Sequence, residues 1–430
     1  MSMKRVDVRN LARCRPYLIW GISASLCLYT FLLQGYPSVM VNRLEGVYGI
    51  GVVRIGILTS SFFYTYIALQ IPAGLLVDKY GPRKVLACGL SLCCAATWWF
   101  AVSHTFWEGQ LSRMIMGLAL SPSVISAFYL VANWVRKGLI FLFITLTECM
   151  LLMGGVFGQG GVAVGVRYFG WRGMLMLLVL IGVVMMVLTV LLIRDGETWE
   201  EKAEARRPLK SRLRNLWCAL KAVLGNGRVW IGSLYGGFLF AVFPAFGALW
   251  GVSYFSALYG IGPVAAAAFT STLFFGAGVG TLILGYLSTR LSYLGGVMIG
   301  APIGACICMA SILMFSGMFE GLMFITVGLL GMFCSAYLFC FSIAIGSVSK
   351  KNKGVATGFT NMISMIFGAP ILQPLIGFLL TLQTRAGGIK ETYTTQSYKF
   401  ALCPLMLCFF GAFCLAFLFE RGEVCTERST

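Results

Sequence analysis

Two charged side chains stand inside long apolar stretches of this 430-residue sequence, and they are the first candidates for chemistry. Glu148 lies about ten residues, or roughly 15 Å of helix, into one stretch, and Arg113 lies near one end of another. Charges in an apolar setting are costly, so they are functional hypotheses by default. A low dielectric would favour the neutral acid of Glu148, whereas a neighbouring Arg113 would favour the carboxylate. A Glu148 that alternated between these surroundings could carry a proton. A structural ion pair with Arg113, or a Glu148 that faces lipid or water, is the alternative.

The composition indicates where these residues must be held. Hydrophobic residues make up 59% of the chain and charged residues only 11%, which is not typical of a soluble globular protein. A helix that crosses a bilayer needs about 20 mostly apolar residues, because the hydrocarbon core is about 30 Å thick. We expect an all-α integral membrane protein with twelve transmembrane helices in two six-helix halves. The twelve stretches lie near residues 17–40, 52–77, 85–104, 107–134, 138–165, 171–193, 228–255, 262–288, 293–316, 320–348, 354–382 and 396–419.

The basic residues are distributed unevenly between the two sides of these predicted helices. With a cytoplasmic N-terminus, 25 of the 33 Lys and Arg residues fall in cytoplasmic segments, seven fall in outer segments, and Arg113 lies within a span. Basic loops are retained on the cytoplasmic side of a membrane. We therefore expect both termini in the cytoplasm, and the net charge of +18 needs no nucleic-acid partner.

A polar stretch over 194–227 divides the chain into an N-terminal half (1–193) and a C-terminal half (228–430). Within it, apolar residues at helical spacing over 209–223 predict a helix that lies on the inner membrane surface or bridges the halves. An internal repeat supports the division, because Gly154-Gly155-x-x-x-Gln159 returns as Gly368-Ala369-x-x-x-Gln373, 214 residues later.

Small residues in a span let a neighbouring helix approach closely. The amides of Gln159 and Gln373 should be buried at matched positions, where they bond between helices or contact substrate; we favour the first. The residues to which we assign helix packing are Gly117, Gly154, Gly155, Gln159, Gly368, Gln373 and Pro374.

A burst of polar residues separates the second and third predicted spans, and it reads Gly-x-x-x-Asp-Lys-x-Gly-x-Arg-Lys. It resembles the loop between the second and third helices of the major facilitator superfamily. Arg113-x-x-x-Gly117 resembles the fourth-helix motif of the same superfamily. The resemblance implies a transporter that works by alternating access, with the loop as a gate that latches the cytoplasmic ends of the two halves. The gate residues would be Gly74, Asp78, Lys79, Gly81, Arg83 and Lys84.

The same resemblance implies a central cavity lined by spans one, four, seven and ten, with the fourth-span arginine facing it. The candidate substrate and proton site then comprises Arg113, Glu148 and the polar and aromatic residues of these spans. Tyr and Trp also collect at membrane interfaces, which is the alternative explanation for them. The further candidates are Gln34, Tyr36, Tyr129, Tyr235, Trp250 and Tyr337, joined by Tyr29, Ser123, Tyr254 and Ser342.

Short motifs, among them Tyr36-Pro37-Ser38, Phe157-Gly158-Gln159 and Gln373-Pro374-Leu375, resemble a narrower group within the superfamily. That group contains nutrient carriers of intracellular bacteria and is similar to lysosomal dipeptide carriers. The resemblance implies uptake of amino acids, short peptides or nucleosides. We expect a multi-pass protein of a bacterial inner membrane, with the lysosomal membrane as the alternative.

The scarcity of residues that could catalyse a reaction or bind a metal reduces the number of functions to consider. His104 is the single histidine and no Cys-x-x-Cys or nucleotide-binding motif occurs, so we expect no enzyme, no cofactor and no metal site. Spans seven to twelve hold no charge deep in their apolar cores, which disfavours multiply charged anions as substrates. We expect a monomeric, proton-coupled importer of a small molecule in a lipid bilayer. A uniporter or an efflux carrier is the alternative, and a non-transporting sensor is a remote one.

Overall fold

Helices form the whole regular structure of the residues that the computed structural model describes, which are 8–195, 209–290, 295–315, 317–349, 352–387 and 393–427. Their bounds are α1 (Val8–Gly35), α2 (Val41–Tyr48), α3 (Val52–Ala68), α4 (Gln70–Tyr80), α5 (Pro82–Val102), α6 (Phe106–Leu120), α7 (Ser123–Trp134), α8 (Ile140–Val156), α9 (Val162–Leu192), α11 (Leu209–Leu224), α12 (Gly227–Phe240), α13 (Gly251–Tyr259), α14 (Pro263–Arg290), α15 (Gly295–Met314), α16 (Glu320–Cys334), α17 (Phe339–Gly346), α18 (Lys353–Ile366), α19 (Gln373–Gly387), α20 (Thr395–Leu402) and α21 (Pro404–Glu427). Short 3-10 segments are η1 (Tyr36–Met40), η2 (Lys137–Leu139) and η5 (Ser335–Leu338).

The number of membrane crossings agrees with the twelve predicted spans. Ten helical stretches of the described chain are long and apolar enough to cross a bilayer, and the pair α3 and α4, bent by 52°, makes an eleventh. One of the ten, Leu142–Leu192, has 51 residues, about 76 Å of helix, which is far more than one crossing needs. It is interrupted at Gly170, whose φ of 71° lies outside the helical region, so it supplies two crossings and brings the total to twelve.

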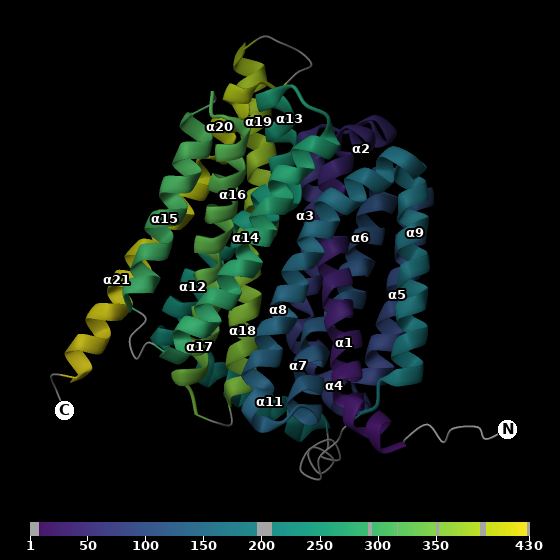
Figure 1. Ribbon diagram of the computed structural model, residues 1–430, viewed down its shortest axis with the longest axis vertical. Helices are drawn as coiled ribbons and strands as arrows, with labels where there is room; N and C mark the ends of the chain where they lie inside the picture. Colours follow the sequence, from purple (N-terminus) through teal and green to yellow (C-terminus); the bar gives the residue numbers. More distant parts are fainter. Residues whose placement is uncertain are drawn as a thin grey trace.

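Figure 1 shows two sets of helices side by side. The N-terminal set (residues 8–195) and the C-terminal set (residues 227–427) meet along α8 and α14 and along α3 and α19. We call the end that carries both termini, α11 and the end of α4 the terminal face. The end that carries α2, α13 and α20 is the opposite face. The helix predicted over 209–223 is present as α11 and packs against α12 and α18, whereas residues 196–208 of the predicted linker lie outside the described residues.

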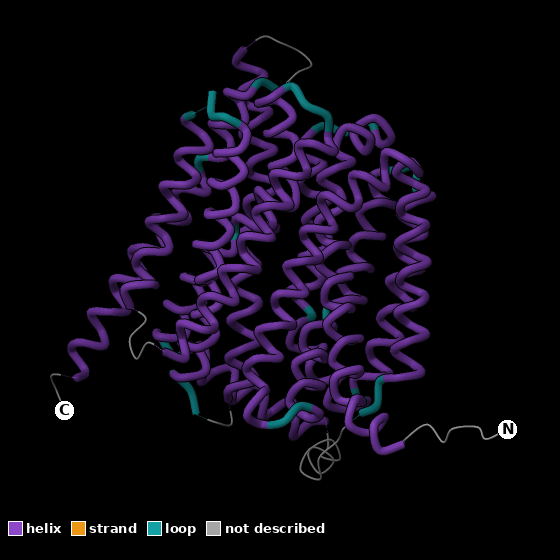
Figure 2. The backbone as a smooth tube through the Cα atoms, in the orientation of Figure 1, coloured by secondary structure: helices purple, strands orange, loops and turns teal. Residues whose placement is uncertain are grey.

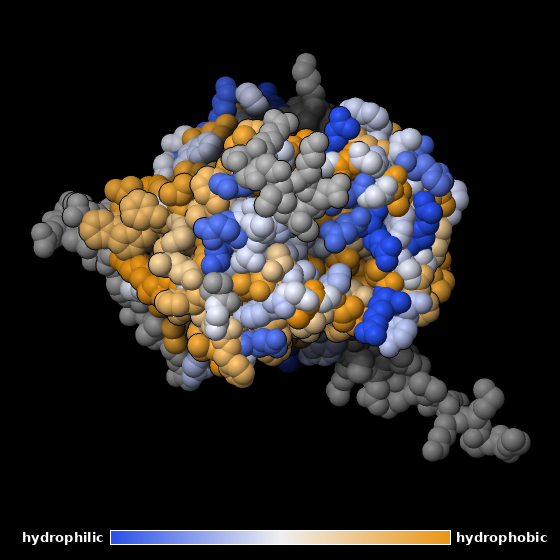
Figure 3. Space-filling model, turned by 90° about the horizontal axis from the view of Figure 1, so that it is seen from above, coloured by the Kyte–Doolittle hydropathy of each residue, from blue (hydrophilic) through white to orange (hydrophobic). Residues whose placement is uncertain are grey.

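The surface has the distribution of polarity that a bilayer requires. Seen from the opposite face, hydrophilic side chains lie in several patches over the end of the bundle, with hydrophobic side chains between them and along the left rim of the view (Figure 3). Many large apolar side chains are exposed on the outward sides of helices, such as Leu180, Ile307 and Phe410. Lipid rather than water is the favourable surrounding for such surfaces.

Nearly all of the described chain is helical, and most of its loops lie at the two ends of the bundle (Figure 2). Three of the described helices are interrupted by π-helical segments. These are η3 (Phe157–Gly161) between α8 and α9, η4 (Phe243–Trp250) between α12 and α13, and η7 (Phe367–Leu372) between α18 and α19. A π segment inserts a residue into the helical ladder and frees backbone groups, and such segments are frequent at functional sites. Segments η3 and η7 carry the two copies of the internal repeat.

The glycines to which we assigned packing lie where helices touch. A Cβ at Gly117 would overlap the backbone of Phe62, and one at Gly154 would overlap the backbone of Leu28. Gly368 lies against Pro244 within the C-terminal set, while Gly155 faces the ring of Phe274 on α14, across the boundary between the sets. Close approach of the backbones is what small residues permit in membranes.

Candidate functional site

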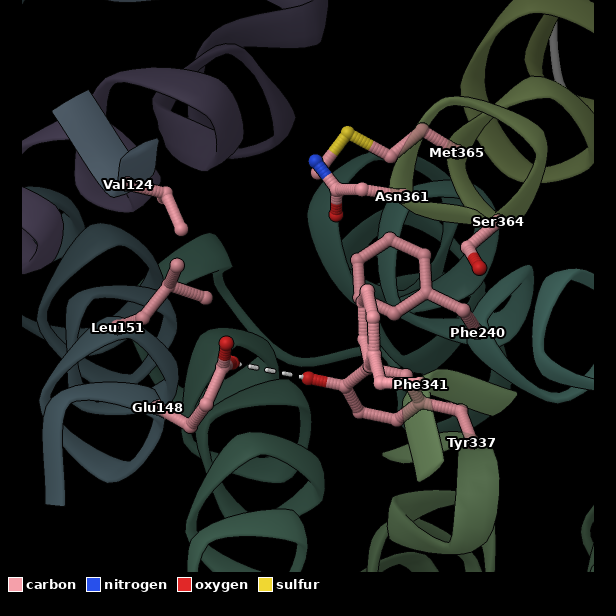
Figure 4. A pocket seen from close by; sticks show the side chains of 9 residues that line it. All are labelled: Val124, Glu148, Leu151, Phe240, Tyr337, Phe341, Asn361, Ser364 and Met365. Carbon is pink, nitrogen blue, oxygen red and sulfur yellow. Dashed lines mark hydrogen bonds between the residues drawn. The ribbon is translucent and has the colours of Figure 1, made fainter. Parts of the chain in front are cut away.

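A cavity lies between the two helix sets (Figure 4). About 20 Å³ of it is open to the centre of a water-sized molecule, so the space between the sets is narrow in this conformation. The N-terminal set contributes residues of α7 and α8, and the C-terminal set contributes residues of α12, η5, α17 and α18. The nine lining residues are Val124, Glu148, Leu151, Phe240, Tyr337, Phe341, Asn361, Ser364 and Met365. The cavity therefore combines aromatic and aliphatic walls with four polar side chains, and Glu148 is its one charged lining residue.

Glu148 connects the two helix sets through this cavity. The Tyr337 hydroxyl donates a hydrogen bond to Glu148 Oε2 at 3.2 Å, from η5 of the C-terminal set to α8 of the N-terminal set. Both side chains are more than nine-tenths buried. A donated hydrogen bond favours the ionised carboxylate, so the proton affinity of Glu148 depends on whether Tyr337 is in reach. Relative movement of the two sets would change that contact.

Arg113 has a different environment from the one that we predicted. It is fully buried in α6, where its guanidinium donates to the backbone oxygens of Leu33 (2.7 Å), Gln34 (3.3 Å) and Thr59 (3.3 Å). Its Cζ lies 5.2 Å from the ring centre of Tyr36 and 5.1 Å from that of Phe62. Arg113 does not line the cavity, and no ion pair joins it to Glu148, although the structure describes both residues.

The sequence explains why a cation is useful at this place. In a regular helix the Leu33 carbonyl would accept from the backbone N–H of residue 37, but that residue is proline and has none. Arg113 supplies the missing donor. Its aromatic neighbours add cation–π contacts. Arg113, Gln34 and Tyr36 thus form a packed layer between α1, α3 and α6.

The other aromatic candidates also serve contacts between helices. The Tyr235 hydroxyl donates to the Met298 carbonyl oxygen at 3.1 Å, and Trp250 Nε1 donates to the Gln373 carbonyl oxygen at 3.1 Å. Both side chains are fully buried and neither lines the cavity. Tyr129 is half-buried on α7 and does not line it either. Of the predicted substrate candidates, Glu148 and Tyr337 line the cavity, and Arg113, Gln34 and Tyr36 come together outside it.

The predicted gate motif is helical over most of its length rather than a loop. Helix α4 continues through Asp78 and Lys79 to Tyr80, and α5 begins at Pro82, so Gly81 alone forms the turn. The Arg83 backbone N–H donates to Asp195 Oδ1 at 2.9 Å, and its guanidinium donates to the Val190 carbonyl oxygen. The motif is thus tied to the end of α9 at the terminal face. The latch role of Asp78 stays a prediction.

Gly81 should not tolerate a side chain. Its φ of 80° disfavours an L residue, and a Cβ would lie 2.6 Å from the Asp195 carboxylate. We expect Gly81→Ala to cost about 1–3 kcal/mol of stability, the usual cost of such a backbone conformation. A thermal unfolding series in detergent measures it. Gly74→Ala is the matched control, because Gly74 is helical with open space around it; equal melting temperatures of the two variants would contradict the expectation.

Most residues of the cavity were not predicted from the sequence. Asn361 and Ser364 lie on α18 within the predicted span 354–382, and Figure 4 shows the Asn361 amide directed into the space between the sets. Phe240 and Phe341 form the aromatic wall. A polar residue eight positions into a span was a usable signal for Asn361, but no pattern along the chain distinguishes these phenylalanines from the many others.

Comparison with known proteins identifies the family. A sequence model described as Major Facilitator Superfamily matches residues 22–372. The chain belongs to this superfamily. Its members are transporters rather than enzymes, as we predicted from the gate and fourth-helix motifs. The all-helical membrane fold of the superfamily is likewise confirmed.

Solved structures of the superfamily share the fold. A bacterial homologue of the human lysosomal transporter Spinster, in an inward-facing conformation, matches with a TM-score of 0.72 at 14% identity over 95% of this chain and 97% of that one. The nucleoside transporter NupG matches with a TM-score of 0.69 at 15% identity over 94% of this chain and 98% of that one. At these identities the likeness concerns the fold alone.

Curated relatives match over shorter segments. A protein of Oryza sativa subsp. japonica named "Probable anion transporter 3, chloroplastic" is 28% identical over 124 residues, which is 28% of this chain and 23% of the relative. The chain thus spans about a quarter of the length of this relative. The printed name of that relative describes an anion transporter, whereas the nine residues that line the cavity of this chain include no Lys or Arg.

Proposed function

We propose that the chain is a secondary active transporter that imports a small polar nutrient, an amino acid, a short peptide or a nucleoside, together with protons. The hydrogen bond between Tyr337 and Glu148 is the main support for proton coupling, because it joins a carboxyl group to the opposite helix set inside the cavity. A carboxyl group whose partner is lost when the sets move can bind a proton in one conformation and release it in the other. Substrate and proton would then move in the same cycle.

The chemistry of the cavity supports a neutral or zwitterionic substrate. Asn361 and Ser364 offer hydrogen bonds, and Phe240, Phe341 and Tyr337 offer aromatic faces. An anion in a poorly solvated site needs a compensating cation. Arg113 is committed to three carbonyl oxygens outside the cavity, so we do not expect it to take that role.

The membrane and the orientation follow the distribution of charge. We propose a bacterial inner membrane, with the terminal face in the cytoplasm and a monomer as the working unit. The lysosomal membrane is the alternative location.

Uptake into proteoliposomes tests this function. Labelled amino acids, dipeptides and nucleosides, with inorganic phosphate and a dicarboxylate as anionic probes, are offered with and without an inward proton gradient. We expect gradient-driven accumulation of one uncharged or zwitterionic class. Equilibration without accumulation would indicate a uniporter, and accumulation of the anions alone would contradict the proposed substrate class. Uptake of apolar cations that is driven by an outward proton gradient would indicate that the protein exchanges protons for these cations, as an efflux carrier does.

Tyr337→Phe tests the contact that carries the proposal. The variant keeps the ring and removes the hydrogen bond to Glu148. Since a hydrogen bond to a charged group is worth about 1.5–3 kcal/mol, we expect proton-driven uptake to fall about tenfold or more, with a smaller effect on substrate exchange. Tyr235→Phe is the matched control, because the Tyr235 hydroxyl bonds Met298 away from the cavity. Equal losses in both variants would contradict a special role for Tyr337.

A further inference from the structure

Two buried glutamines occupy equivalent positions in the two copies of the internal repeat. Gln159 lies within η3 and Gln373 directly follows η7, 214 residues later. Neither side chain is exposed at all. A buried amide must be satisfied by hydrogen bonds, so the partners of these two side chains show what they hold together.

Gln373 joins the two helix sets. Its Nε2 donates to the Pro244 carbonyl oxygen at 2.8 Å, within the C-terminal set. Its Oε1 lies 3.0 Å from the hydroxyl of Ser60 on α3, in the N-terminal set. The same hydroxyl lies 2.6 Å from the Ala369 carbonyl oxygen. In the π register of η7 that oxygen would accept from residue 374, which is proline and has no N–H, so Ser60 supplies the donor that the helix lacks.

Gln159 makes the corresponding contacts in the other copy. Its Nε2 donates to the Gly35 carbonyl oxygen at 3.1 Å, and its Oε1 accepts from Ser38 at 2.6 Å, both within the N-terminal set. The hydroxyl of Thr270 on α14, in the C-terminal set, lies 3.5 Å from the same Oε1.

Ser271, which follows Thr270 on α14, also contacts the copy of the repeat that contains Gln159. The Ser271 hydroxyl accepts from the Gly160 backbone N–H at 3.0 Å and lies 3.2 Å from the Val156 carbonyl oxygen, which it can donate to. Ser271 on α14 therefore meets η3 as Ser60 on α3 meets η7. The two serines are 211 residues apart, close to the spacing of the glutamines. Each copy of the repeat thus meets a serine hydroxyl of the other helix set, which bonds Gln373 directly in one copy, whereas Gln159 meets the other set through Thr270.

Both contacts lie beyond the cavity, towards the opposite face. Gln159 is 11 residues past Glu148 and Gln373 is 9 residues past Ser364, about 16 Å and 14 Å of helix respectively. Opening the cavity to the opposite face would require α3 to leave η7 and α14 to leave η3. Those movements break the hydrogen bonds of Ser60 and Ser271.

We propose that Gln159 and Gln373, with Ser271 and Ser60, form a duplicated latch that holds the helix sets together between the cavity and the opposite face. The glutamines are positioning residues of the transport cycle and do not contact substrate. The latch goes beyond the proposed function, because it concerns which face is closed and not what is carried. Its removal should favour the conformation that is open to the opposite face.

A distance measurement in the full chain tests the latch without any substrate. Spin labels on non-canonical amino acids are placed at Asn42 on α2 and Gln396 on α20, which are exposed at the opposite face in different sets. Pulsed electron–electron double resonance then reports the distance between the two spin labels. We expect the wild type to populate mainly the short distance. Gln373→Met, which keeps the side-chain size, should raise the ratio of long to short distances about fivefold, as for one lost buried hydrogen bond. Gln159→Met should raise it less, because Gln159 meets the other set only through the longer contact with Thr270.

Milder variants and a control complete the experiment. Ser60→Ala and Ser271→Ala remove one hydroxyl each and should give smaller shifts, and Ser60→Ala should add little to Gln373→Met, because both remove the same contact. Gln70→Met is the control, since Gln70 is buried but its Nε2 has no hydrogen-bond partner. Unchanged distances in the two serine variants and in the glutamine variants that fold would overturn the latch. A failure of uptake would bear on the proposed function and leave this measurement intact.

Discussion

Glu148→Gln is expected to abolish accumulation of substrate against its gradient while leaving exchange of substrate across the membrane measurable. An amide cannot take up and release a proton, whereas it can still accept the hydrogen bond of Tyr337 and keep the cavity packed. With one proton per substrate, a gradient of one pH unit supports about tenfold accumulation, because one unit corresponds to about 1.36 kcal/mol. The variant should equilibrate without accumulating.

The measurement compares the internal and external concentrations of labelled substrate in proteoliposomes at a fixed pH gradient. Glu320→Gln is the matched control, because this acid is exposed at the start of α16 and does not line the cavity. Full gradient-driven accumulation by Glu148→Gln would remove Glu148 as the coupling residue. The structural alternative, in which Glu148 only fastens α8 to η5, predicts accumulation close to that of the wild type, because the amide keeps the hydrogen bond from Tyr337.

Arg113→Leu should chiefly destabilise the protein, whereas a substrate-binding role for Arg113 would make loss of affinity the main effect. The substitution removes the side-chain donor from three backbone oxygens in a buried layer, including the Leu33 carbonyl that Pro37 cannot serve. Loss of charge-assisted hydrogen bonds of this kind costs about 2–4 kcal/mol. We expect a clearly lower midpoint of thermal unfolding in detergent, and Arg113→Lys should recover only part of it, since one ammonium group cannot reproduce the guanidinium geometry.

The same samples distinguish the two roles of Arg113. Substrate affinity, measured per folded molecule by binding in detergent, should stay within a few-fold of wild type. A tenfold or larger loss of affinity at unchanged melting temperature would contradict the packing role. It would place Arg113 in the binding site, as the fourth-helix motif of the superfamily implies.

The sequence alone determined the membrane fold, because the signal is local and strong. About 20 consecutive apolar residues suffice to predict a crossing, and the predicted stretches agree with helices such as α5 and α14 to within a few residues. The gate and fourth-helix motifs were enough to indicate the superfamily, and Glu148 stood out because a charge in a span is expensive. The repeat around Gln159 and Gln373 was also visible in the sequence.

Only the tertiary structure decided which side chains meet. Arg113 and Glu148 are close enough along the membrane axis to suggest a pair, but periodicity does not report the rotation of one helix against another. In the fold Arg113 turns to the carbonyl that Pro37 leaves free, and Glu148 turns to Tyr337, 189 residues away. The cavity residues on α18 and the serines that meet the two glutamines likewise depend on contacts between distant segments. Such contacts are set by packing between the helix sets, for which a single sequence carries no local signal.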